Sequence, residues 1–237
     1  MKVRTLFLFL FYIVLVICLT PILLFCILFG IREPFYDLGK AAMRLSRWIL
    51  GLRLEVTGLE HVDRAKTYVF MGNHTSFIDG PLLFMLIPQH VRVILKKSIF
   101  RLPVLGFGMK YVGFIPVDRK RAQRGKEAIE RAARQMRERK YSFLIFPEGT
   151  RSRDGNLAVF RRGGFFLAVE SGAPIVPVSI RGTFEIMPKG RFFVKKGDIR
   201  VSFRPAIPVQ NTGAQDLTDL MDKVRTSIQD GLGEERT

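Results

Sequence analysis

Hydrophobic positions are concentrated at the start of this chain, where residues 5–30 carry no charged side chain. A straight helix over these 26 residues is about 39 Å long, against a bilayer hydrocarbon core of roughly 30 Å. The pattern predicts a membrane segment that spans with tilt. Pro21 favours a break near the middle, so two shorter apolar helices dipping into one leaflet are the alternative. We expect the segment to be retained, because a cleaved signal has an apolar core of only ~7–15 residues.

Residues 34–50 follow this stretch and mix basic with apolar positions at helical spacing, ending near Trp48. This pattern favours an amphipathic helix lying at the level of the lipid headgroups. A helix packed on the adjoining domain is the alternative.

Beyond residue 50, short apolar runs alternate with amphipathic or charged segments. Residues 52–59 alternate apolar and polar positions like a half-exposed strand, and five later runs are mostly apolar, as buried strands are. Those runs are YVFMGN, VRVILKK, GFIPVDR, FLIFPEG and PIVPVSIRG. Helices are predicted at residues 76–87, 103–111, 122–140 and 164–171. The alternation predicts an α/β fold with a largely parallel central sheet flanked by helices.

The C-terminal part of the chain predicts a hairpin and a helix. Residues 191–209 have the pattern of two antiparallel strands that turn at residues 196–198 and extend one sheet edge. A helix follows, with one apolar face made of Leu217, Leu220, Met221, Val224 and Ile228. We expect a membrane segment over 1–32, an interfacial helix over 33–50, one α/β domain over 51–210, and a C-terminal helix and tail over 211–237.

Length and cysteine content narrow the possibilities. The 237 residues suffice for one α/β domain with an appendage. Cys18 and Cys26 are the only cysteines, and both lie in the apolar stretch. A disulfide framework or thiolate metal site is therefore excluded for the rest of the chain.

The net charge is +17, and residues 113–163 alone carry 14 Lys or Arg against 6 Asp or Glu. Such charge attracts nucleic acids, anionic lipid surfaces and phosphorylated substrates alike. No helix-turn-helix, zinc-finger or aromatic RNA-binding signature accompanies it. We therefore expect lipid phosphates as partners and no nucleic acid.

The stretch GNHTSFIDG, residues 72–80, places His74 five positions before Asp79 at a predicted strand-to-helix turn. One interpretation is structural: Ser76 is a good N-cap, and Asp79 three positions later completes a capping box. The other is catalytic: the carboxylate holds the imidazole in one tautomer while the second ring nitrogen takes a proton from a hydroxyl. Asp79 can serve both roles at once.

No nucleophile of the protein's own is evident, because the chain lacks G-x-S-x-G and its cysteines lie in the apolar stretch. A base without a protein nucleophile indicates direct attack by a substrate hydroxyl on an activated acyl group.

Several cationic positions could bind a phosphate. Arg151 and Arg153 in FPEGTRSRDG can pair with it bidentately, while Glu148 beside Gly149 can hold a polar substrate or fix an arginine. A charged turn with an internal salt bridge is the alternative. Further candidates lie at strand ends or before a helix: Asp118, Arg119, Lys96, Lys97, Arg161 and Arg162. Each of these is equally compatible with a solvated surface charge.

Four blocks, NHTSFID, GFIPVDR, FPEGTR and IVPVSI, together resemble the 1-acylglycerol-3-phosphate acyltransferases, also called lysophosphatidate acyltransferases. The resemblance covers roughly residues 50–210. It implies transfer of a fatty acyl chain from acyl-CoA or acyl carrier protein to the 2-hydroxyl of lysophosphatidate, giving phosphatidate, with no metal and no cofactor.

The resemblance also implies roles for individual residues. His74 is the base and Asp79 its orienting partner. Acceptor binding falls to Arg119, Glu148, Gly149, Thr150, Arg151, Lys96 and Arg162, and the block containing Pro177 is linked to the acyl donor. Family membership further implies a membrane protein with its catalytic domain on the cytoplasmic face, at the inner membrane if bacterial.

Two departures from the family pattern concern the acceptor. Pro116 follows Ile115 where an aromatic residue is common, and the F-R-R-G run has arginine for lysine. Neither departure changes the number of positive charges in these blocks. Other acceptors therefore stay open, namely glycerol-3-phosphate, a lysophospholipid or a lyso-aminolipid, as does a non-catalytic lipid-binding protein.

Overall fold

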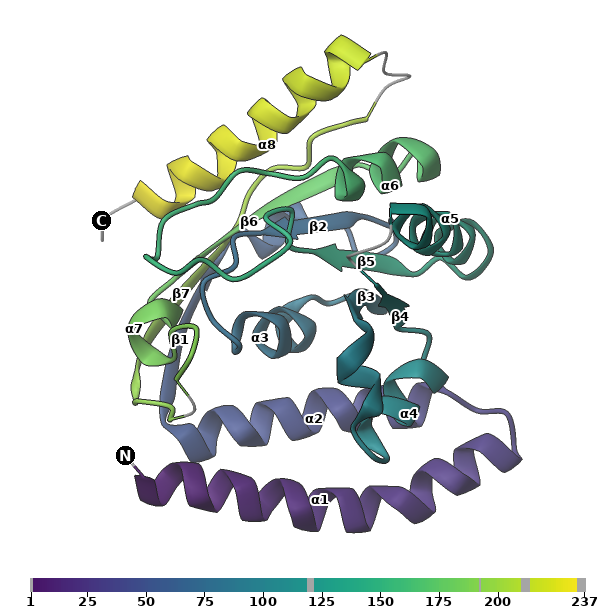
Figure 1. Ribbon diagram of the computed structural model, residues 1–237, viewed down its shortest axis with the longest axis vertical. Coiled ribbons are helices and arrows are strands. Elements are labelled where there is room, and N and C mark those ends of the chain that lie inside the picture. Colours follow the sequence, from purple (N-terminus) through teal and green to yellow (C-terminus); the bar gives the residue numbers. More distant parts are fainter. Residues whose placement is uncertain (1, 119–121, 192, 210–213, 234–237) are drawn as a thin grey trace.

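The computed structural model describes residues 2–118, 122–191, 193–209 and 214–233. They form a seven-stranded sheet in the order β1-β7-β6-β2-β5-β3-β4, with helices on both faces (Figure 1). The strands are β1 Leu52–Thr57, β2 Val69–Gly72, β3 Val91–Lys96, β4 Ile115–Val117, β5 Ser142–Ile145, β6 Ile175–Arg181 and β7 Gly197–Phe203. The predicted α/β fold is confirmed.

The five strands β6, β2, β5, β3 and β4 run parallel to one another. At the other edge, β7 is antiparallel to β6, and β1 is parallel to β7. Because the carboxyl ends of the five parallel strands meet at one edge, the loops that follow them gather there.

The predicted hairpin over residues 191–209 is wrong. Residue Gly197 starts a single strand, β7, which pairs with β1 along its length from Leu52↔Gly197 to Thr57↔Ser202. Upstream of it, Val194 is buried and the Lys195 N–H donates to the Ile186 carbonyl at 3.1 Å, so this stretch packs against the preceding helix. β7 therefore pairs with the distant strand β1, and not with a neighbouring strand joined to it by a local turn.

Two hydrophobic clusters cover the faces of the sheet. On one face lie α5 Ala122–Arg139, α6 Gly163–Ser171 and α8 Ala214–Gly233 (Figure 1). The predicted apolar face of α8 is confirmed, because Leu217, Leu220, Val224 and Ile228 are buried. On the other face lies α3 Asp79–Leu86, and the shorter elements are η1 Leu59–His61, η2 Lys97–Arg101, α4 Leu105–Tyr111 and α7 Thr183–Ile186.

The helices α1 Lys2–Leu28 and α2 Glu33–Leu50 form the outermost layer beyond α3 (Figure 1). Pro21 lies inside the continuous α1, so the predicted alternative of two helices broken there is wrong. Within α1, residues Phe9–Leu28 are long and apolar enough to cross a membrane.

The helix α2 packs on the domain and also presents an apolar side to the exterior. Lys40 is buried and donates from Nζ to the Ile87 carbonyl at 2.6 Å, and burial lowers its pKa to about 8. On the exposed side lie Leu45 and Trp48. The structure thus confirms that this segment packs on the domain, and its position at the lipid headgroups stays a prediction.

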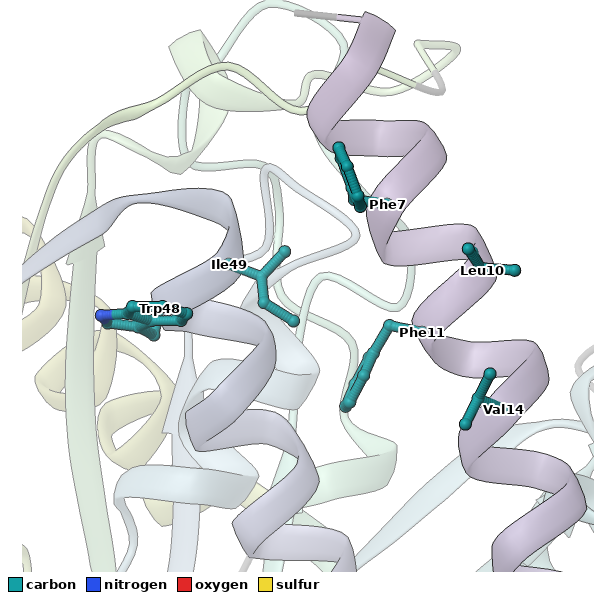
Figure 2. Close-up of a pocket in the computed structure, with 6 residues that line it drawn as sticks. All are labelled: Phe7, Leu10, Phe11, Val14, Trp48 and Ile49. Carbon is teal, nitrogen blue, oxygen red and sulfur yellow. The ribbon is translucent and has the colours of Figure 1, made fainter.

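Between α1 and α2 lies an apolar pocket of about 490 Å³ (Figure 2). Phe11 of α1 and Ile49 of α2 point toward one another across it. Its lining is completed by Phe7, Leu10, Val14 and Trp48. All six residues are apolar or aromatic, so the pocket belongs to the outer layer and supplies no group for acid–base chemistry.

Candidate active site

His74 and Asp79 form a hydrogen-bonded pair in the turn between β2 and α3. The distance from His74 Nδ1 to Asp79 Oδ2 is 2.9 Å, and Asp79 is fully buried. The same oxygen accepts the backbone N–H groups of Thr75 at 2.8 Å and Ser76 at 2.7 Å. One carboxylate oxygen therefore fixes both the turn and the imidazole.

The capping interpretation is half right. Asp79 reaches back to the Ser76 N–H, as the acid of a capping box does. However, α3 begins at Asp79 with Ile78 as the N-cap, and the Ser76 hydroxyl donates to the Met187 carbonyl at 2.7 Å. Ser76 ties this turn to the segment after α7.

The imidazole of His74 is held in a fixed orientation by Asp79 and Phe146. A carboxylate at Nδ1 favours the tautomer with the proton there, which leaves Nε2 as the acceptor. One face of the ring stacks on Phe146, with centroids 4.1 Å apart and planes 17° apart. The side chain is 19% exposed, so a substrate hydroxyl can reach it.

Asn73 supports the strand that leads into this turn. Its side chain donates to the Ile180 carbonyl at 2.8 Å and accepts the Ile180 N–H at 2.7 Å. These two bonds continue the pairing of β2 with β6 past the last strand residue, so the backbone can leave the sheet at His74.

Glu148, just after β5, holds the backbone of the catalytic turn. Its Oε1 accepts the His74 N–H at 2.6 Å, and its Oε2 accepts the Ala158 N–H at 2.9 Å. Burial raises the pKa of this carboxyl, against the effect of the two amide donors. Since both oxygens are engaged by backbone groups, the structure gives Glu148 a positioning role, and its predicted contact with an acceptor stays a prediction.

Gly149 allows the loop after β5 to lie close to the side chain of Arg161. It has φ +72, and a Cβ there would lie 2.9 Å from Arg161 Cδ. A side chain at this position would therefore be strained and would displace Arg161. The Arg161 N–H also donates to the Pro147 carbonyl at 2.8 Å, which brings residues 161–162 beside this loop.

Cationic groups gather on the exposed side of the same loop. Arg151 lies 5.8 Å from the centroid of the exposed Phe77 ring. Lys189 donates to Thr150 Oγ1 at 3.1 Å and to the Arg151 carbonyl at 3.2 Å. The sequence reasoning missed Lys189, because it stands in a turn 38 positions downstream of Arg151 with no motif around it.

The remaining predicted residues lie on different elements, and they differ in how far they are buried. Lys96 ends β3, two strands from β2 on the same sheet edge, and is exposed. Arg162 is exposed at the start of α6. Pro177 is buried within β6 opposite Met71, inside the sheet rather than on its surface. Arg119 lies outside the described residues.

The described residues contain no group of three or more His, Cys, Asp or Glu side chains arranged to hold a metal ion. Their arrangement supports general-base chemistry: an oriented imidazole faces an accessible space, with cations a short way along the loop.

A family model described as Acyltransferase matches residues 53–181, which include all of β1 but its first residue, the strands β2 through β6 and the turn that holds His74 and Asp79. The chain belongs to the acyltransferase family. This finding confirms the resemblance that the four sequence blocks carried.

Named relatives of this chain include plant and bacterial proteins. A chloroplastic 1-acyl-sn-glycerol-3-phosphate acyltransferase of Brassica napus is 34% identical over 182 residues, which are 76% of this chain and 51% of the relative. A 1-acyl-sn-glycerol-3-phosphate acyltransferase of Borreliella burgdorferi is 31% identical over 190 residues, covering 80% of this chain and 75% of the relative. The chain spans about half the length of the first curated relatives it matches.

The chain also has a solved structural neighbour. The crystal structure of the 1-acyl-sn-glycerophosphate acyltransferase PlsC from Thermotoga maritima superposes with a TM-score of 0.80 at 20% identity. The match covers 98% of this chain and 97% of that chain, including the α1–α2 layer. It supports the fold as a whole.

Proposed function

We propose that this protein transfers an acyl group from a thioester donor to the sn-2 hydroxyl of 1-acyl-glycerol-3-phosphate, giving phosphatidic acid. The observation that carries the proposal is the His74–Asp79 pair, with Nδ1 bound at 2.9 Å and the ring partly exposed. The choice of acceptor follows the names of relatives at 28–35% identity, which are called 1-acyl-sn-glycerol-3-phosphate acyltransferases.

The reaction needs one base and an oriented acceptor. Nε2 of His74 takes the proton of the acceptor hydroxyl as its oxygen bonds to the thioester carbonyl carbon. The carbon–sulfur bond then breaks, and the imidazolium returns its proton to the departing thiolate. Asp79 stabilises the imidazolium between these two steps. This sequence uses no metal and no cofactor.

The loop beyond Glu148 holds the acceptor. Arg151 and Lys189 provide positive charge for its phosphate, and the exposed ring of Phe77 beside Arg151 gives an apolar surface for an acyl chain. Fixing the phosphate holds the hydroxyl near the base, which is how positioning contributes to rate.

We place the enzyme at a membrane, with the catalytic domain on the cytoplasmic side. The apolar α1 and the exposed Trp48 of α2 support membrane attachment, and the net charge of +17 favours an anionic surface. Donor and acceptor tails then stay out of water during transfer.

The proposed function is tested with the purified full chain in detergent or vesicles. Thiol release from acyl-CoA and formation of phosphatidic acid are measured with lysophosphatidate, glycerol-3-phosphate, lysophospholipids and a lyso-aminolipid in parallel, and with acyl carrier protein as a second donor. Release that depends on lysophosphatidate is expected. Lipid binding without any thiol release would identify a non-catalytic lipid-binding protein instead.

Arg151→Ala is expected to weaken acceptor binding while leaving the chemical step intact. A hydrogen bond to a charged group contributes about 1.5–3 kcal/mol, which corresponds to a rise of about 10- to 100-fold in KM for lysophosphatidate. Initial rates against both substrates check this. The control Arg134→Ala removes an exposed cation from α5, and an unchanged KM in Arg151→Ala would remove Arg151 from the acceptor site.

Arg225 of α8 is expected to be a positioning residue. It donates to the carbonyls of Ala158 at 2.7 Å and Leu157 at 3.0 Å, and the Ala158 N–H binds Glu148, which binds His74. Arg225→Met keeps the apolar stem but releases this loop. We expect kcat to fall about 10-fold, a size typical of groups that orient catalytic residues.

Kinetics and melting temperature together check the Arg225 prediction. Lys223→Met on the same helix removes an exposed charge and serves as the control. A lower melting temperature with an unchanged kcat would mean that Arg225 only fastens α8.

A further inference from the structure

A second concave region lies at the sheet edge formed by β1 and β7. This groove has a volume of about 1100 Å³ and continues along α7 and the segment that precedes β7. Its lining residues are Arg53, Leu54, Glu55, Arg181, Gly182, Glu185, Ile186, Lys195, Lys196, Gly197, Asp198, Ile199 and Arg200. Five basic and three acidic side chains thus face one open space.

Seven of the eight charged side chains of the groove fall into two groups, and the eighth is the exposed Glu185 of α7. Arg53 pairs with Asp198, and Arg200 pairs with Glu55 at 3.2 Å, so these four bind one another across β1 and β7. The exposed Arg181, Lys195 and Lys196 form no ion pair with any acidic side chain in the described part of the chain. Three cations are therefore available for an anion with several charges.

The groove and the catalytic turn are separated by the short helix α7. On one side, Thr183 Oγ1 lies 3.1 Å from Thr75 Oγ1, and Ser76 donates to Met187. On the other side, Gly182, Glu185 and Ile186 line the groove. Arg181 itself ends β6, so it lies at the same sheet edge as His74.

Close backbone packing fixes the groove's place beside the site. Gly182 has φ +91, and a Cβ there would lie 2.2 Å from the Asp198 carbonyl oxygen. A Cβ on Gly197 would lie 2.9 Å from Ile186 Cγ1. Arg181 therefore lies on a segment that packs against the segment of Lys195 and Lys196, although Arg181 and Lys195 are 14 positions apart in the sequence.

We propose that this groove binds the phosphates of a coenzyme A thioester, with Arg181, Lys195 and Lys196 as the phosphate ligands. The proposal rests on the function proposed above, because it concerns the donor of that reaction. The pantetheine arm separates the thioester from the nucleotide, so the thioester can reach His74 while the phosphates lie beyond α7. Coenzyme A carries three phosphate groups, which suits three cations without an ion pair among the described residues better than the single phosphodiester of a carrier-protein arm does.

The test compares Lys195→Ala/Lys196→Ala with Arg134→Ala/Lys223→Ala, which loses the same charge from exposed positions on α5 and α8. Each variant is assayed in the full chain with acyl-CoA and with an acyl thioester of N-acetylcysteamine, which lacks the nucleotide. In the groove variant, KM for acyl-CoA is expected to rise about 10- to 100-fold, as for lost charged hydrogen bonds. Rates with the truncated donor and KM for lysophosphatidate are expected to match the control.

Direct binding of adenosine 3′,5′-diphosphate, measured by calorimetry, gives a readout that does not depend on turnover. Binding to the wild type and the control, with loss in the groove variant, supports the site even if the proposed reaction fails. An unchanged KM for acyl-CoA together with unchanged nucleotide binding would overturn it. So would equal losses with both donors, or a loss confined to binding of vesicles containing anionic lipid, which would assign these cations to headgroups.

Discussion

Replacement of His74 by alanine is expected to lower kcat about 100- to 10,000-fold, which is the contribution of general-base catalysis, because no second accessible base lies in the described turn. The imidazole is the accessible proton acceptor in the turn, and Asp79 and Glu148 are buried and already bonded to backbone amides. Water can replace the base only inefficiently. Thiol release from the donor, measured under saturating lysophosphatidate, checks the loss.

The fold is expected to survive this substitution. The ring is partly exposed, and Asp79 keeps its bonds to the Thr75 and Ser76 N–H groups when the imidazole is gone. Melting temperature and vesicle binding should therefore stay close to the wild type. His61→Ala, in η1 after β1, is the matched control and should retain full activity. A His74→Ala protein that turns over at the wild-type rate would rule out the proposed mechanism.

Much of the fold could be predicted because short apolar runs and charged helices alternate so regularly. Each of the five buried runs became a strand of the parallel sheet, and the charged segment 122–140 became α5 with Ala128 and Ala132 inward. The pairing of β7 was not predicted. It lies between β6 and the distant edge strand β1, and the local pattern around residues 196–198 indicated a turn where β7 instead pairs with β1.

The contact between His74 and Asp79 could be predicted because both residues belong to one turn, where sequence spacing fixes proximity, and their catalytic roles stay a prediction. The groups around the pair come from elsewhere in the chain. Phe146 stacks on the ring from the end of β5, Ala158 shares Glu148, and Lys189 supports Thr150 from beyond α7. These contacts depend on how long loops return to the sheet edge, which no local pattern encodes.

The part played by α8 extends this point. The sequence predicted a helix that covers the core, and its apolar face does so. Its polar face also contacts the candidate active site, because Arg225 binds the loop whose Ala158 amide binds Glu148. Three hydrogen bonds then connect the C-terminal helix to the His74 backbone. The helix α8, which was predicted only to cover the core, thus also helps to position the backbone of His74.

Asp79→Asn is expected to separate the two roles of this carboxylate. Oδ2 accepts all three described bonds, from His74 Nδ1 and the Thr75 and Ser76 N–H groups, whereas Oδ1 is buried without a partner among the described residues. An asparagine can place its carbonyl oxygen where Oδ2 lies, and the turn stays closed. The negative charge that stabilises the imidazolium is lost, so kcat should fall about 1000- to 10,000-fold.

Comparison with Asp79→Ala makes the test decisive. Alanine leaves the Thr75 and Ser76 N–H groups buried without an acceptor, at a cost of about 1–3 kcal/mol each, so its melting temperature should fall well below that of Asp79→Asn. Both variants should lose turnover, and alanine should lose more stability, because asparagine leaves only its own amide group without a partner, at the position of Oδ1. If Asp79→Asn instead kept the wild-type kcat, the carboxylate would serve the turn alone, and His74 would act without an orienting charge.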